Sequence, residues 1–148
     1  MTEIKNKFLL GAVAGIAANI IINILDYILY FFNFSEYLAL HIAASIYFPI
    51  GELKTIEAVI FGLVLDYILA IILGIATVYF LHYTGTDLFI VKGIAIGTIS
   101  TLLVDGLLLE VVEDTVDAFD PEHLTHHLLL GVLIAWFCIK FGQITNPE

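Results

Sequence analysis

The chain has 148 residues, of which 61% are hydrophobic and 14% are charged, and its mean hydropathy is +1.04. A domain of about 150 residues hides only about 70% of its unfolded surface from water, so lipid must surround most of this chain, which excludes soluble enzymes, secreted disulfide scaffolds and disordered tails. There are 15 acidic residues against five lysines and no arginine, for a formal charge of −10. Nucleic-acid binding is excluded because it requires basic residues opposite phosphates, and any charged ligand is expected to be a cation.

Four apolar segments are long enough to cross a membrane, since about 20 helical residues span about 30 Å of hydrocarbon. We expect these helices over residues 8–32, 56–81, 88–109 and 121–142, with the third extending to about residue 117. The fourth begins with an N-cap residue, Asp120, followed by a proline at the first helical position. The sequence therefore predicts a single transmembrane domain, an all-α bundle of four transmembrane helices.

A shorter apolar run lies between the first two predicted membrane helices. It covers Glu36–Phe48, has Ser35 as a plausible N-cap, and is ended by Pro49 and Gly51. It is too short to span the membrane, which predicts an interfacial or re-entrant helix on the outer side.

The lysines predict the orientation of the bundle. Lys5 and Lys7 precede the first helix, Lys92 follows the second, and Lys140 lies near the end of the fourth. Because lysines concentrate in cytoplasmic loops, both termini are expected inside, which leaves only Lys54 and the acidic segment before the fourth helix outside.

Each predicted helix carries one stripe of small and polar residues at helical spacing. In lipid, small residues allow close packing and polar residues form interhelical hydrogen bonds, so these stripes should face the bundle interior. The stripes, in chain order, are Ala12, Gly15, Asn19, Asn23, Asp26 and Tyr30; Gly62, Asp66, Ala70 and Thr77; Thr98, Thr101 and Asp105; and His127, Gly131, Ala135, Cys138 and Gly142. The first and third helices also open alike, with the glycine pairs 11/15 and 93/97, which fits two parallel helical hairpins.

Three of the stripe residues are aspartates, Asp26, Asp66 and Asp105, and no Lys or Arg accompanies them within the predicted spans. An acid inside the membrane is costly and indicates a functional site. Three explanations stay open: protonation, because burial and mutual repulsion disfavour the charged form; a water-filled vestibule; or a bound cation. A purely structural role, with hydrogen bonds to Asn19 or Asn23, is the alternative to these. For the three aspartates together we favour a cation or proton role.

The acidic segment and the histidines that follow it form a second candidate site. Imidazole and carboxylate groups suit Zn, Fe, Mn, Ni or Cu, and two histidines one helical turn apart can chelate one ion. The candidate metal ligands are Glu110, Glu113, Asp117, His123, His126 and His127, with His41 and Glu52 on the other outer connection available to complete the site. The alternatives are a solvated acidic rim and a pH sensor based on the histidines.

The Gly11-Ala-Val-Ala-Gly15 opening before a polar stripe and the His127-Leu-Leu-Leu-Gly131 entry to the last helix carry a resemblance. In these features and in its layout the chain resembles small uncharacterised four-helix inner-membrane proteins of bacteria. The resemblance implies four helices and a location in the bacterial cytoplasmic membrane. It implies no established activity and no catalytic residues.

The leading functional prediction is a non-enzymatic membrane protein that binds protons or a divalent metal through an acidic, histidine-containing vestibule on its outer side. Such a protein could be a small transporter, a channel or a sensor. The sequence contains neither a G-x-S-x-G nor an H-E-x-x-H motif, and Ser100 has no evident base on its own helix face. The alternatives are an accessory subunit of a larger membrane complex or homo-oligomer, and a membrane-embedded metalloenzyme with an open coordination position.

Overall fold

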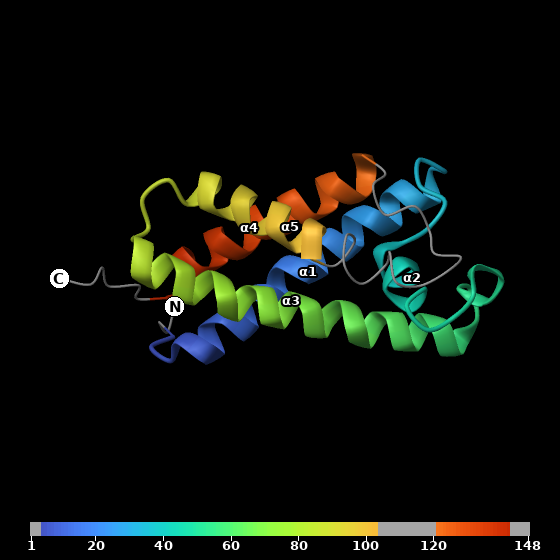
Figure 1. The fold of residues 1–148 in the computed structure, drawn as a ribbon, viewed down its shortest axis with the longest axis horizontal. Coiled ribbons are helices and arrows are strands. Elements are labelled where there is room, and N and C mark those ends of the chain that lie inside the picture. The colour runs from blue at the N-terminus through green and yellow to red at the C-terminus, as the bar shows by residue number, and fades with distance from the viewer. Residues whose placement is uncertain (1–3, 104–120, 143–148) are drawn as a thin grey trace.

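The computed structural model describes residues 4–103 and 121–142, with the backbone alone at 121–123. Within these ranges the chain is helical, as predicted: α1 (Lys7–Phe31), α2 (Ala39–Ala44), the 3-10 helix η1 (Ile50–Glu52), α3 (Ile56–Thr84), α4 (Phe89–Leu103) and α5 (Pro121–Phe141) (Figure 1). Helices α1, α3 and α5 are long and apolar enough to cross a membrane. Helix α4, with 15 residues, is a shorter apolar helix.

The ends of the long helices follow local capping chemistry. The Asn6 side chain accepts a hydrogen bond from the Leu9 amide at 3.1 Å, and Thr55 accepts one from the Ala58 amide at 3.4 Å. Each bond satisfies an amide that has no partner inside its helix. Helix α3 continues to Thr84, three residues beyond the predicted end, and stops at Gly85, whose φ of 79° a side chain would disfavour. The predicted extension of the third helix to residue 117 lies outside the described residues.

The predicted interfacial helix over 36–48 is wrong in its length and in its cap. Helix α2 covers only Ala39–Ala44, and Ser35 does not cap it, because the Ser35 hydroxyl donates to the Tyr37 carbonyl at 2.6 Å and so closes a local turn. The helix begins instead where the Leu38 amide donates to Nδ1 of His41 at 3.2 Å. Helix α2 packs on α3, where a Cβ added to Gly62 would collide with the Leu40 carbonyl.

The described helices form two antiparallel hairpins, α1 with α3 and α4 with α5 (Figure 1). In both hairpins the two helices make contact at glycines. The backbone of the partner helix lies so close to each glycine that an added Cβ would collide with that backbone. The contacting pairs are Gly11 with Gly74, Gly15 with Ala70, Gly93 with Gly131, and Gly97 with His127. The two predicted glycine pairs therefore lie at helix–helix contacts, the packing that small residues provide in lipid.

Helix α1 packs against α5 as well as α3, and this joins the hairpins. The shared core includes Leu10, Ile22, Leu81 and Ile134, which are all at most 1% exposed. The Ile4 amide donates to the Phe141 carbonyl at 2.9 Å, so the start of α1 and the end of α5 lie at the same end of the molecule (Figure 1).

Candidate functional site

Asp66 of α3 sits at a polar contact with α1, inside the first hairpin. The side-chain nitrogens of Asn19 and Asn23 lie 2.6 and 2.8 Å from its Oδ2 atom. Asn23 also donates to the Asn19 carbonyl at 3.0 Å. Asp66 is 8% exposed and Asn19 is fully buried. The structure therefore brings together three of the five predicted intramembrane polar residues.

One atom of this Asp66 cluster has no partner. Oδ1 of Asn19 is buried and makes no hydrogen bond, which costs about 1–3 kcal/mol for a buried polar group. The 2.6 Å separation between Asn19 and Asp66 is also shorter than the roughly 2.7–3.2 Å typical of N–H···O bonds and falls in the O–H···O range. If the Asn19 amide turned over, its oxygen would face Asp66 and could accept a hydrogen bond from a protonated carboxyl group.

Asp26 makes the second polar contact of α1, this time with α5. Its carboxylate oxygens lie 2.9 and 3.1 Å from Nδ1 of His126, and the two side chains are 15% and 6% exposed. The sequence suggested no basic partner for this aspartate and grouped His126 with the metal ligands. A partner 100 residues away leaves no local pattern, so only the packing of α1 on α5 reveals it.

A cavity of about 320 Å³ opens at the Asp26–His126 pair, between α1 and α5. Its other lining side chains are apolar apart from Thr125, and include Ile22, Leu25 and Leu129. The pair therefore forms the polar part of an otherwise largely apolar cavity, whereas Asp66 lies deeper between α1 and α3.

The second hairpin has a polar contact of its own. The Ser100 hydroxyl of α4 lies 3.3 Å from Nδ1 of His127 on α5, and both residues are buried. The sequence shows no base on the helix face of Ser100, and the imidazole beside it comes from a neighbouring helix. Thr98, predicted to face the interior, is half-exposed and donates to the Ile94 carbonyl of its own helix, while Thr101 is buried as expected.

The predicted metal site is only partly visible. Glu110, Glu113, Asp117 and the intramembrane candidate Asp105 lie outside the described residues, as does the side chain of His123. His126 and His127 are adjacent, with ring centres 5.3 Å apart, but they bond to different helices. Among the side chains of residues 4–103 and 124–142, no group of three His, Cys, Asp or Glu could hold a metal ion. The metal site stays a prediction.

His41, which was predicted to complete the metal site, instead packs and caps within the region of α2. It is buried, its Nδ1 accepts the Leu38 amide, and its ring packs edge-on against Tyr30 and Tyr37. Burial, and secondarily the nearby Lys54 ammonium, lower the pKa of His41. Glu52 lies in η1 and is exposed. Neither residue joins a metal-ligand cluster with other described residues.

Comparison with known proteins adds no relative: no protein family, no curated protein and no solved structure matches this chain.

Proposed function

We propose that this chain is a multi-pass protein of the bacterial cytoplasmic membrane that binds and releases protons at the polar contacts of α1 with α3 and α5. The observation that carries the proposal is the Asp66 cluster, in which a buried carboxylate accepts hydrogen bonds from the amides of Asn19 and Asn23. The amide oxygen of Asn19 has no hydrogen-bond partner.

The apolar surface supports the membrane location. Large side chains such as Ile24 and Ile60 point outward and are 57% and 58% exposed, which suits lipid better than water. The contact between Ile4 and Phe141 supports an even number of crossings, because it joins the start of α1 to the end of α5. With α1, α3 and α5 as three crossings, the shorter apolar helix α4 would belong to the fourth. The lysine distribution then favours both termini inside.

The Asp66 cluster is suited to two protonation states. When Asp66 is charged, the amide nitrogens of Asn19 and Asn23 donate to it, as their present orientation has it. When Asp66 is protonated, its O–H can donate to Oδ1 of Asn19 once that amide has turned over, because an amide offers either a donor or an acceptor. A proton can therefore enter without leaving the carboxyl group unpartnered.

The Asp26–His126 pair extends this chemistry toward the cavity. Asp26 follows Asn23 by three residues on α1, so the two lie on neighbouring turns of one helix face. A histidine beside a carboxylate exchanges its proton in the physiological pH range more readily than any other side chain. Because Asp26 and His126 line the 320 Å³ cavity, this pair is the more accessible of the two sites.

Infrared difference spectroscopy of the purified protein, between acidic and neutral pH, tests the proposal. A protonated carboxylic acid has a C=O stretch that a carboxylate lacks, and we expect such a band to appear on acidification. Asp66→Asn should remove one component of the band and Asp26→Asn should remove another or shift it.

Asp87→Asn is the matched control, because Asp87 is exposed in the connection between α3 and α4. This variant should leave the components assigned to Asp66 and Asp26 unchanged. If both interior variants leave the difference spectrum unchanged, the interior aspartates do not exchange protons and the proposal fails.

A further inference from the structure

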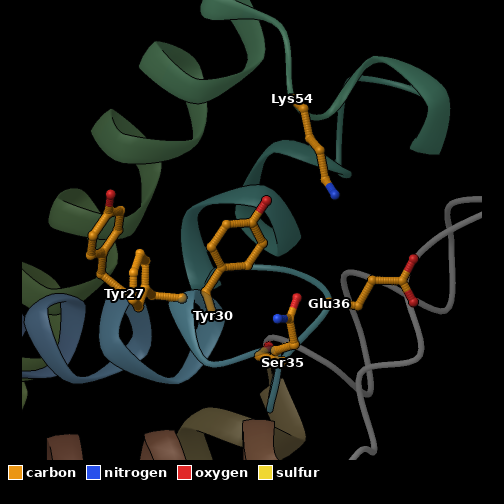
Figure 2. A pocket seen from close by; sticks show the side chains of 7 residues that line it. Tyr27, Tyr30, Ser35, Glu36 and Lys54 are labelled. Carbon is orange, nitrogen blue, oxygen red and sulfur yellow. The ribbon is translucent and has the colours of Figure 1, made fainter.

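A second cavity, of about 310 Å³, lies at the end of α1 far from the termini. Figure 2 shows Tyr27 and Tyr30 of α1, Ser35 and Glu36 of the following turn, and Lys54 around it. No residue of the Asp66 cluster or of the Asp26–His126 pair lines it. Its volume lies in the range of about 300–1,000 Å³ that is usual for small-molecule sites.

Lys54 supplies positive charge to this cavity. Its ammonium lies 5.6 Å from the centre of the Tyr30 ring and 5.4 Å from that of Tyr37, within the distance of a cation–π contact. In the part of the chain that the structure describes, no carboxylate lies within ion-pair distance of Lys54. The ammonium is therefore held in place by aromatic rings while its N–H donors stay available to a ligand.

His41 packs against the two tyrosines, Tyr30 and Tyr37, that contact the Lys54 ammonium. The His41 ring packs edge-on against Tyr30 and Tyr37, with ring centres 6.2 and 6.3 Å apart. His41 is itself anchored, since it is buried and accepts the Leu38 amide. The cation, both tyrosines and α2 thus form one packed unit, which reduces the entropy lost when a ligand binds.

Glu36 supplies negative charge to the same cavity. It is exposed and follows a tight turn in which Asn33 has a left-handed φ of 57°. Glu36 itself lies between Ser35 and Tyr37, which the bond from the Ser35 hydroxyl to the Tyr37 carbonyl holds together. Figure 2 shows Lys54 reaching in from above and Glu36 rising from the turn below it. A ligand that satisfies both must carry an anionic and a cationic group a short distance apart.

We propose that this cavity binds a phosphate that carries an ammonium group, as in the headgroup of a zwitterionic phospholipid. Lys54 would bind the phosphate, and Glu36 would bind the ammonium. The position suits a lipid, because Phe31, Phe32 and Phe34 beside the cavity are 64–75% exposed and exposed aromatic residues gather where membrane helices meet headgroups. The inference depends on the proposed membrane location, but it does not depend on proton binding.

Native mass spectrometry of the detergent-purified full chain tests the site. The protein is titrated with phosphatidylethanolamine, with phosphatidylglycerol, which lacks the ammonium, and with water-soluble phosphoethanolamine. We expect one phosphatidylethanolamine per chain to bind at least about tenfold more tightly than phosphatidylglycerol, a difference of about 1.4 kcal/mol. Lys54→Gln should weaken the binding of both lipids, while Glu36→Gln should remove only the preference for the ethanolamine headgroup.

Lys5→Gln is the matched control, since Lys5 is exposed at the opposite end of the molecule, and it should bind like the parent. Binding of soluble phosphoethanolamine that is equally sensitive to Lys54→Gln would support the site and assign it a soluble ligand. Equal affinity of the parent for both lipids, or unchanged binding by Lys54→Gln, would overturn the proposal. Neither result bears on the infrared band of Asp66, so this proposal and that of proton binding can fail separately.

Discussion

The two helical hairpins have the same backbone contact and different polar contents. In α1–α3 and in α4–α5, a pair of glycines four residues apart meets a small residue or bare backbone on the partner helix. One turn further along, the first hairpin buries Asp66 with two asparagines, whereas the second buries a neutral hydroxyl, Ser100, beside His127.

This difference distinguishes the glycine contacts that pack the helices from the ionisable side chains that could bind protons. Glycine contacts that involve no charge occur in both hairpins, and close packing of small residues is one way in which helices associate in lipid. Among the described helices, α1 contacts Asp66 of α3 on one side and presents Asp26 to His126 of α5 on the other. We therefore expect changes at the glycines to affect both hairpins alike, and polar changes to affect them unequally.

The largest expected effect comes from filling the glycine contacts. Gly15→Leu drives a side chain into the Ala70 carbonyl, and Gly97→Leu drives one into the His127 carbonyl. Because backbone atoms cannot rotate away, each variant should lose about 3 kcal/mol or more of unfolding free energy. Reversible unfolding in mixed micelles measures this loss.

Gly51→Ala is the control for these variants, since a Cβ at Gly51 meets no atom within 4 Å. It should unfold within about 0.5 kcal/mol of the parent. If Gly97→Leu proved harmless while Gly15→Leu did not, the similarity of the two hairpins would be limited to their geometry.

The helix contacts could be predicted from sequence because their physics is local. Composition predicts a lipid environment, and helical spacing of small residues predicts the interior face of each helix. Gly11, Gly15, Gly93 and Gly97 do lie at helix contacts. The start of α2 could not be predicted. A serine hydroxyl can accept a bond from a backbone amide and cap a helix, or it can donate to a nearby carbonyl and form a turn. In the structure the Ser35 hydroxyl donates to the Tyr37 carbonyl.

The next largest effect is expected from replacing Asp66. Asp66→Leu leaves the buried amide nitrogen of Asn19 without its acceptor, while the amide nitrogen of Asn23 keeps the Asn19 carbonyl. The lost acceptor should cost up to about 3 kcal/mol of unfolding free energy. Asp66→Asn keeps an acceptor oxygen and should cost about 1 kcal/mol. The same micelle unfolding assay measures both variants, and a Leu variant as stable as the parent would contradict the hydrogen-bonded cluster.

A smaller loss is expected at the matching contact of the second hairpin. Ser100→Ala removes one neutral hydroxyl at 3.3 Å from His127, and a bond of this kind contributes about 0.5–1.5 kcal/mol. The ratio of the Asp66→Leu and Ser100→Ala losses measures the asymmetry of the hairpins directly. A Ser100→Ala loss as large as that of Asp66→Leu would mean that both hairpins depend equally on polar contacts.

The sequence indicated which polar residues belong to the site, but it could not predict which of them form pairs. Asn19, Asn23 and Asp66 were selected because polar residues inside a membrane helix are exceptional. Their pairing, and that of Asp26 with His126, depends on how α1 docks between two helices that lie 47 and 100 residues away along the chain. Such docking is decided by packing over whole helices and leaves no short motif.

The smallest expected effect concerns α2, the short helix in the connection between α1 and α3 of the first hairpin. The lowered pKa of His41 means that the unfolded chain takes up a proton at this residue at a higher pH than the folded protein does. The stabilisation by neutral His41 is therefore complete above the ordinary value of 6.5 and is lost as the pH falls below it. Protonation would also turn Nδ1 into a donor and break its bond to the Leu38 amide.

Hydrogen exchange of residues 38–44, corrected for intrinsic rates, measures this effect. Protection in the parent should fall by a fewfold between about pH 7 and about pH 5, the range in which histidine titrates. His41→Gln should remove most of that fall, because all other titrating groups are common to both proteins. Lys54→Gln should reduce it, since the Lys54 ammonium is the second cause of the shift after burial. A parent whose α2 protection is independent of pH would mean that helix packing on Gly62, rather than the neutral imidazole, holds α2 against the first hairpin.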